Sequence, residues 1–99
     1  MAARIINGSE MAARIREATA ERVAALKASG VNVRLDAIIV GDPAAGVIYA
    51  RSQEKRCAKV GVEYRLHTLD ASIDDDHLQN FIEELSHDDA VTGVMLNLP

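Results

Sequence analysis

A tyrosine and a glutamine one helical turn apart are the residues of this chain best suited to form a binding site. Tyr49 and Gln53 lie four positions apart in a segment with helical spacing, so their side chains share one face of the helix. A phenol ring can stack on a planar ligand, and an amide can donate and accept hydrogen bonds without titrating. The same pair also fits a core aromatic residue whose hydroxyl group is satisfied, so spacing alone does not establish a site.

The helix with this pair follows a strand that the sequence predicts to be buried on both faces. Residues 33–40 form a nearly continuous apolar run rich in branched side chains, which is typical of a strand in a parallel sheet. A similar strand is expected at residues 91–98, with Asn97 near its carboxyl end. Because ligands of open α/β sheets bind outside the carboxyl ends of the strands, Asn97 is expected to face Tyr49 and Gln53.

The remaining segments complete an alternation of helices and strands. The expected elements are a helix over residues 9–28 that Ser9 caps and Gly30 ends, the strand 33–40, the helix 43–60, a half-exposed edge strand at 62–67, a helix from a capping box at 72–75 to about His87, and the strand 91–98. The order α-β-α-β-α-β predicts an α/β fold with three αβα layers and a mostly parallel sheet. Because no helix follows the last strand, we expect a fragment of a larger domain.

Composition excludes several classes of function. With 48% hydrophobic and 26% charged residues, the chain has the composition of a soluble globular protein. A net charge of −4 argues against non-specific binding to nucleic acid. No apolar run is long enough to span a membrane, and the N-terminus lacks the features of a signal peptide. We therefore expect a cytoplasmic protein, and the one cysteine, Cys57, which cannot form an internal disulfide, fits a reducing compartment.

The other polar clusters predict no metal or cofactor site. Three aspartates at residues 74–76 suit the positive end of a helix dipole, and His67, His77 and His87 recur at a spacing that matches no metal site, so we expect exposed histidines. The glycine-rich dinucleotide fingerprint is absent. Arg56 shares the helix face of Gln53 and either offers charge to the site or belongs to the solvated surface.

Four segments together match a known pattern. They are Ile5-Ile6-Asn7-Gly8, V-G-D-P-A-A at residues 40–45, Y-A-R-S-Q-E-K-R-C-A-K-V-G at 49–61 and G-V-M-L-N-L-P at 93–99. In these segments the chain resembles the N-terminal part of the bifunctional methylenetetrahydrofolate dehydrogenase/methenyltetrahydrofolate cyclohydrolase family. That family has V-G-D-x-P/A-A, Y-V-x-S-K-x-K-x-C-x-x-x-G and G-I-L-V-Q-L-P at the corresponding places. The resemblance extends over essentially all 99 residues.

This resemblance implies a folate site in which the tyrosine is kept and the proton-handling residue is exchanged. In the family the tyrosine stacks on the folate, the lysine four residues later is the principal acid/base or electrostatic group of the cyclohydrolase step, and the glutamine of V-Q-L-P orients that lysine. Tyr49 carries over directly, whereas Gln53 replaces the lysine and Asn97 the glutamine. If the Asn97 amide reaches Gln53, the two exchanges together change one contact, the one between residues 53 and 97, in a coordinated way. The expected catalytic residues are Tyr49, Gln53 and Asn97, and the expected substrate-binding residues are Tyr49, Ser52, Gln53, Asn97, Leu98 and Pro99.

The resemblance also implies an activity for the full-length protein. It is expected to oxidise methylenetetrahydrofolate to methenyltetrahydrofolate with NADP or NAD, and to hydrolyse the product to formyltetrahydrofolate, in one-carbon metabolism. A carboxamide cannot transfer a proton, so the hydrolytic step is expected to be slower by about 10²- to 10⁴-fold. Hydride transfer needs positioning above all and is expected to survive.

Partners follow from the same resemblance. Tetrahydrofolate derivatives are the expected ligands, a homodimer is the expected assembly, and the nicotinamide cofactor is expected to bind a C-terminal domain that is absent from residues 1–99. Two alternatives stay open. One is a catalytically degenerate paralogue that binds folate or a partner without turnover, and the other is a Rossmann-like binding module unrelated to folate.

Overall fold

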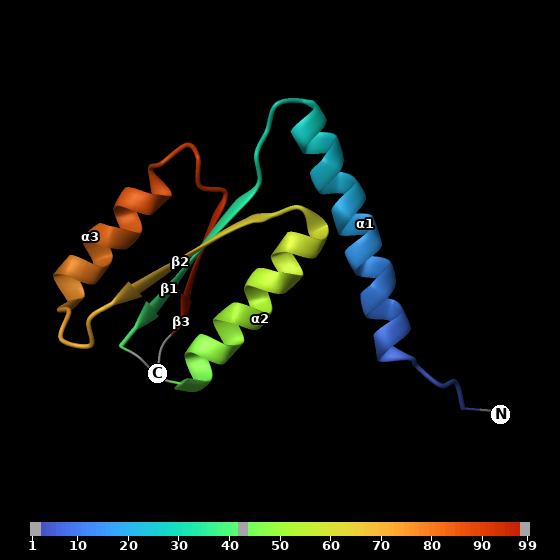
Figure 1. The fold of residues 1–99 in the computed structure, drawn as a ribbon, viewed down its shortest axis with the longest axis horizontal. Helices are drawn as coiled ribbons and strands as arrows, with labels where there is room; N and C mark the ends of the chain where they lie inside the picture. Colours follow the sequence, from blue (N-terminus) through green and yellow to red (C-terminus); the bar gives the residue numbers. More distant parts are fainter. Residues whose placement is uncertain (1–2, 42–43, 98–99) are drawn as a thin grey trace.

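The chain forms a three-stranded parallel sheet with helices on both faces (Figure 1). The computed structural model describes residues 3–41 and 44–97. In chain order the elements are α1 (Gly8–Ala28), β1 (Arg34–Val40), α2 (Ala44–Val60), β2 (Glu63–Leu69), α3 (Asp75–Ser86) and β3 (Gly93–Asn97). The predicted order and the predicted α/β class are therefore confirmed.

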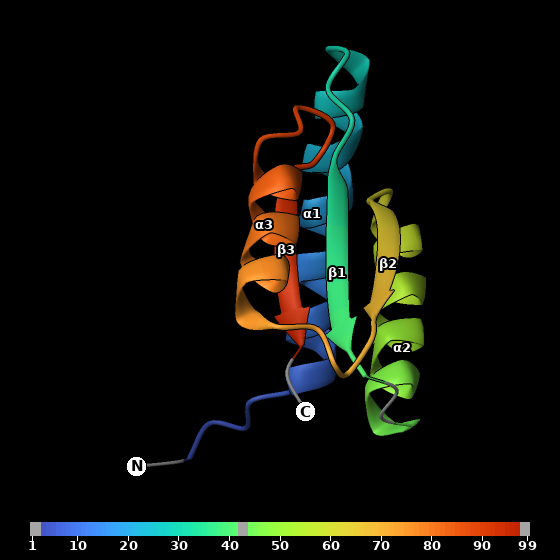
Figure 2. The same ribbon diagram turned by 90° about the vertical axis from the view of Figure 1, so that its left-hand side faces the viewer.

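The strand order is β2-β1-β3, so the strand predicted to be buried on both faces is the central one. Figure 2 shows the three strands running in the same direction. The strands are parallel, with Leu35 of β1 beside Tyr64 of β2 and Gly93 of β3. Because side chains alternate along a strand, Leu35, Ala37 and Ile39 face one helix layer and Arg34, Asp36 and Ile38 face the other.

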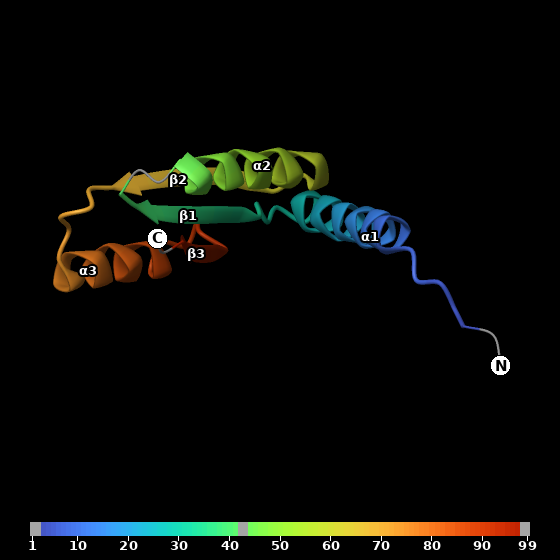
Figure 3. The same ribbon diagram turned by 90° about the horizontal axis from the view of Figure 1, so that it is seen from below.

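The two layers of helices lie on opposite sides of the sheet. Figure 3 shows α2 over one face and α3 over the other. The core sits between them at β1, where Ala37, Ile38 and Ile39 are 0–1% exposed and Ala50 of α2 is fully buried. In the same strand Arg34 and Asp36 are also buried. The prediction of a strand buried on both faces is confirmed, but the strand carries two charges into the core.

The first helix begins one residue earlier than predicted. Asn7, and not Ser9, is the N-cap, because its Oδ1 accepts a hydrogen bond from the backbone N–H of Glu10 at 3.1 Å. Both residue types favour this position, so the sequence alone could not rank them. At the other end Gly30 has a φ of +89°, and its N–H donates to the carbonyl of Lys27. This left-handed glycine ends the helix as predicted.

Helix α1 packs on α2 and extends beyond the sheet (Figure 1). Val23 is its one buried residue among those described, whereas Met11 and Ile15 are exposed. Helix α3 begins after Asp74, whose side chain accepts a hydrogen bond from the backbone N–H of His77. None of the helices in the described ranges is long and apolar enough to cross a membrane.

Candidate functional site

The side chain of Gln53 spans the central strand. Its Oε1 accepts a hydrogen bond from the hydroxyl group of Tyr64 on β2 at 3.0 Å, and its Nε2 donates to the Sδ of Met95 on β3 at 3.1 Å. In the sheet, Tyr64 lies beside Leu35 and Met95 beside Ala37, both on β1. The amide therefore lies over β1 with its oxygen toward one edge strand and its nitrogen toward the other.

Asn97 lies on the same face of the sheet, two residues beyond Met95 at the carboxyl end of β3. Its Nδ2 atom is buried and has no hydrogen-bond partner within residues 3–41 and 44–97. A buried donor without a partner costs about 1–3 kcal/mol, so such an atom in a native structure calls for an explanation. A ligand that offers an acceptor at this position would supply the missing partner.

The expected contact between Asn97 and Gln53 is not formed. The Gln53 amide instead makes one hydrogen bond at each polar atom, to Tyr64 and to Met95, which hold the side chain over β1. The Asn97 nitrogen has no partner in the described residues, so it does not donate to Gln53. The re-tuned contact inferred from the sequence is therefore wrong, and two separate amides take its place.

Tyr49 lies one turn before Gln53 on α2 and is 50% exposed. An exposed ring on the helix that follows the central strand is free to stack on a planar ligand. Ser52, on the same helix, is half-buried. Leu98 and Pro99, which the sequence predicts to line the substrate site, lie outside the described residues, as do Asp42 and Pro43 of the V-G-D-P segment.

Tyr64 is the site residue that sequence reasoning missed. It belongs to β2, where apolar and polar residues alternate in the sequence from Val62 to His67, and this alternation indicates which face its side chain shares but not which residue it contacts. Burial is the main cause that raises the pKa of its phenol above the ordinary value, so the hydroxyl group keeps its proton at neutral pH. Tyr64 can therefore donate its hydroxyl proton to the Gln53 oxygen throughout the neutral pH range.

A groove between α1 and α2 extends to Gln53. It is lined by Ala12, Ile15, Arg16, Thr19, Leu35, Gln53, Arg56, Cys57 and Val60. Arg56 is exposed in this groove, so its charge belongs to the solvated surface as well as to the neighbourhood of Gln53. Burial raises the pKa of the Cys57 thiol, which disfavours the reactive thiolate.

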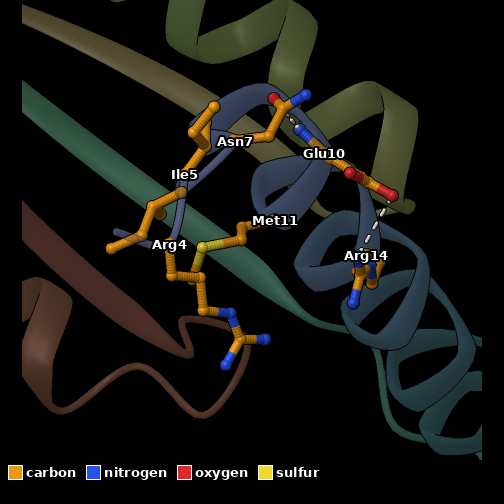
Figure 4. Close-up of a pocket in the computed structure, with 7 residues that line it drawn as sticks. Arg4, Ile5, Asn7, Glu10, Met11 and Arg14 are labelled. Atoms are coloured by element: carbon orange, nitrogen blue, oxygen red, sulfur yellow. Dashed lines mark hydrogen bonds and ion pairs between the residues drawn. The ribbon is translucent and has the colours of Figure 1, made fainter. Parts of the chain in front are cut away.

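A second hollow surrounds the start of α1 (Figure 4). Its lining residues are Arg4, Ile5, Ile6, Asn7, Glu10, Met11 and Arg14. Figure 4 shows Arg14 paired with Glu10, at 3.1 Å, and Asn7 occupied by the N-cap hydrogen bond. None of the site residues predicted from the sequence lies in this hollow.

The opposite face of the sheet holds a buried ionic cluster that was not predicted. The Arg34 guanidinium donates to both oxygens of Asp36, with its Nε and one terminal nitrogen 2.8 and 2.9 Å away. The Nε2 of His67 lies 2.8 Å from Oδ2 of Asp36. The His67 ring also packs edge-on against Phe81 of α3, with centroids 5.3 Å apart. The expectation of exposed histidines is wrong for His67, because β2 brings it beside the carboxylate of β1.

Two opposing influences set the pKa of Asp36. Burial is the largest and raises the pKa, but hydrogen bonds from Arg34 and His67, together with their charges, outweigh it and lower the pKa below the ordinary value. The carboxylate is therefore ionised and fully paired. Both oxygens of the carboxylate have partners within the protein, so the cluster offers a ligand no unpaired carboxylate oxygen, and its role is structural.

Metal binding has no support in the part of the chain that the structure describes. Within it, no three histidine, cysteine, aspartate or glutamate side chains are grouped in a way that could hold an ion. His77 instead contacts Asp74, the residue that caps its own helix.

Comparisons with known proteins agree on one family. The family model for the tetrahydrofolate dehydrogenase/cyclohydrolase catalytic domain matches residues 6–99. The bifunctional protein FolD of Geobacillus kaustophilus is 46% identical over 99 residues, which are the whole of this chain and 35% of that protein. Residues of this chain thus correspond to about a third of the length of that relative.

Solved structures give the same result. The bifunctional FolD enzyme, methylenetetrahydrofolate dehydrogenase/cyclohydrolase, of Campylobacter jejuni superposes with a TM-score of 0.87 at 33% identity, over 91% of this chain and 32% of that one. The corresponding enzyme of Trypanosoma brucei, solved with NADP cofactor and inhibitor, gives a TM-score of 0.83 at 26% identity, over 98% of this chain and 33% of that one.

Proposed function

Because the chain belongs to the tetrahydrofolate dehydrogenase/cyclohydrolase family, we propose that it is the folate-binding part of an enzyme of one-carbon metabolism. The full-length protein oxidises methylenetetrahydrofolate to methenyltetrahydrofolate. The observation that carries this proposal is the grouping of an exposed aromatic ring, Tyr49, with two amides, Gln53 and Asn97, on one face of the sheet. One of these amides has a buried donor that lacks a partner in the described part of the chain.

Each residue has a role that follows from its position. Tyr49 stacks on the planar part of the folate, which fixes the plane of the ligand. Asn97 donates from Nδ2 to an acceptor atom of the ring system, and Gln53 donates near the one-carbon bridge. These contacts hold the carbon that loses the hydride in place. Positioning of this kind is the contribution that a protein makes to hydride transfer.

The nicotinamide cofactor is not assigned to this chain. The sequence has no glycine-rich dinucleotide fingerprint, and the described residues include no such loop before α2. We propose that NADP or NAD is bound by the rest of the full-length protein. The NADP in the trypanosomal relative supports a nicotinamide acceptor for the family.

The cyclohydrolase step is the one that Gln53 weakens. A lysine with a lowered pKa can transfer a proton or stabilise developing negative charge, whereas a carboxamide does neither. We expect the full-length protein to retain the dehydrogenase activity and to hydrolyse methenyltetrahydrofolate about 10²- to 10⁴-fold more slowly than a lysine-containing variant.

Two assays on the full-length protein and its Gln53→Lys variant test this proposal. Reduction of the nicotinamide measures the dehydrogenase, and loss of methenyltetrahydrofolate absorbance measures the cyclohydrolase. The substitution is expected to raise the second rate and not the first. Equal hydrolysis by the native protein and the variant would show that Gln53 does not separate the two activities.

A degenerate paralogue is the second candidate function. It is favoured by one observation, namely that both polar atoms of Gln53 are already paired inside the protein. In that case the full-length protein binds tetrahydrofolate without oxidising it. Calorimetric titration with tetrahydrofolate, together with the dehydrogenase assay, separates the two candidates.

Assembly and location are further proposals. We propose a homodimer, which the family resemblance supports. We also propose a cytoplasmic location, which fits a sequence whose one cysteine forms no internal disulfide. Light scattering of the full-length protein measures the assembly.

A further inference from the structure

The chemistry of its two partners fixes the orientation of the Gln53 amide. The thioether sulfur of Met95 can only accept a hydrogen bond, so the group that faces it must be the amide nitrogen. A flipped amide would place an oxygen acceptor against the sulfur acceptor. On the other side, the Tyr64 hydroxyl group donates to the oxygen. The sulfur of Met95 therefore selects the amide orientation, and in that orientation the Tyr64 hydroxyl group, which can donate or accept, donates to the amide oxygen and holds it.

This orientation decides what Gln53 can offer to a ligand. The Oε1 atom is taken by Tyr64, and one hydrogen of Nε2 is directed at Met95. The second hydrogen of Nε2 remains as a donor, whereas the lone pair left on Oε1 is on the side of Tyr64 and β2. The nitrogen also lies on the side of β3, the strand that carries Asn97. A lysine ammonium likewise offers donors and no acceptor, so this glutamine keeps the polarity of a lysine without its charge.

We propose that Tyr64 is a positioning residue that makes Gln53 a one-way hydrogen-bond donor to the substrate. This rests on the proposed function, because it assigns a detail of the same folate site. Tyr64 acts through Gln53 alone. The part-buried, protonated phenol holds the amide oxygen, and the site then selects ligand atoms that accept hydrogen bonds, such as a carbonyl oxygen or a nitrogen lone pair at the one-carbon bridge.

Without the Tyr64 hydroxyl group, the amide oxygen loses its donor, and only the weak contact of Nε2 with the Met95 sulfur still holds the amide. The Gln53 side chain can then turn its oxygen toward the ligand, where it meets another acceptor. The expected result for Tyr64→Phe, which keeps the ring, is a three- to tenfold lower kcat/KM of the dehydrogenase, about the effect of one neutral hydrogen bond.

A double-mutant cycle in the full-length protein separates positioning from packing. Gln53→Met keeps the length of the side chain but removes its donors and its carbonyl acceptor. In the Gln53→Met background, Tyr64→Phe is expected to cause no further loss of kcat/KM. Thr68→Val is the matched control, because it removes a hydroxyl group from the same face of β2. Thr68 lies four residues beyond Tyr64, the residue of this strand that Gln53 contacts. It is expected to leave kcat/KM unchanged.

A second readout does not depend on turnover. The side-chain amide signal of Gln53 in a ¹⁵N NMR spectrum is identified by its loss in Gln53→Met. Tyr64→Phe is expected to shift this signal, and Thr68→Val is expected to leave it in place. An unmoved signal, or an equal loss of kcat/KM in both backgrounds, would overturn the positioning role. If the full-length protein turns over no folate, the proposed function fails, and the amide signal alone then decides whether Tyr64 orients Gln53.

Discussion

The two faces of the sheet use polar side chains in opposite ways. On the α3 face, both oxygens of Asp36 are paired, with Arg34 and His67 as donors. On the α2 face, the Asn97 nitrogen is buried without a partner in the described residues, and Gln53 is held by one hydroxyl group and one weak sulfur acceptor. A single strand, β1, separates a completed network from an incomplete one.

This difference shows where the fold is stabilised and where it can bind. A buried carboxylate with both oxygens paired stabilises its own structure but offers a ligand no unpaired oxygen. An incomplete network costs stability until a ligand supplies the missing partner, and proteins accept such costs at functional sites. The contrast predicts that substitutions on the α3 face reduce stability, whereas those on the α2 face reduce activity.

Removal of the Asp36 carboxylate is expected to have the largest effect. Asp36→Ala leaves the buried Arg34 charge without its partner, and breaking a buried ion pair in this way costs about 3–5 kcal/mol of unfolding free energy. Denaturant unfolding of the full-length protein, with hydrogen exchange of the β1 amides, measures the loss. Glu10→Ala is the control, because it breaks an exposed ion pair with Arg14. Equal effects of the two substitutions would contradict a structural role for the cluster.

The aromatic ring on the other face is expected to matter for binding and not for stability. Tyr49 is half-exposed, so Tyr49→Ala removes little core packing. It does remove the stacking surface, and the KM for methylenetetrahydrofolate is expected to rise about tenfold. Tyr49→Phe retains the ring and is expected to keep a KM close to the native value. A KM that follows the hydroxyl group and not the ring would rule out stacking.

Asn97→Leu is expected to move activity and stability in different directions. The leucine replaces a buried donor that has no described partner, so the unfolding free energy is expected to stay unchanged or to rise by up to about 1 kcal/mol. The dehydrogenase kcat/KM is expected to fall severalfold, because the ligand loses a donor. Thermal unfolding and steady-state kinetics on one preparation give both numbers. A marked loss of stability would mean that the Asn97 nitrogen has a partner within the full-length protein.

Acid is expected to have the smallest effect, and it acts on the α3 face. The pKa of Asp36 is lower in the folded protein than its ordinary value of about 3.9 in an unfolded chain. Its contribution to stability is therefore complete above about pH 4 and is lost as the pH falls through the folded pKa. The stability difference between the native protein and Asp36→Asn is expected to shrink below pH 4. A difference that grows in acid would contradict the lowered pKa.

The sequence predicted the fold because its signals are local. The apolar run at 33–40, the helical spacing of Tyr49 and Gln53, and the glycine after α1 each depend on neighbouring residues. The ionic cluster was missed because apolar neighbours dominate the pattern around Arg34 and Asp36. Their spacing of two residues places both on one face of a strand, and this was the signal that could have revealed the pair.

The contacts of the site could not be predicted in the same way. Gln53 contacts Tyr64 on one side and Met95 on the other because the strand order is β2-β1-β3. The sequence did not predict this order. The wrong contact between Gln53 and Asn97 has the same origin, because the amide of Gln53 bonds to Tyr64 and Met95 instead. Local spacing therefore named the α2 residues of the site, and topology determined their partners.

The most direct test is a crystal structure of the full-length protein with a tetrahydrofolate analogue. The predicted result is a ligand stacked on Tyr49, with an acceptor atom within hydrogen-bond distance of the Asn97 nitrogen and with the Gln53 oxygen still bonded to Tyr64. A ligand bound elsewhere, with the Asn97 nitrogen unpaired or paired inside the protein, would contradict the assignment of the α2 face as the folate site.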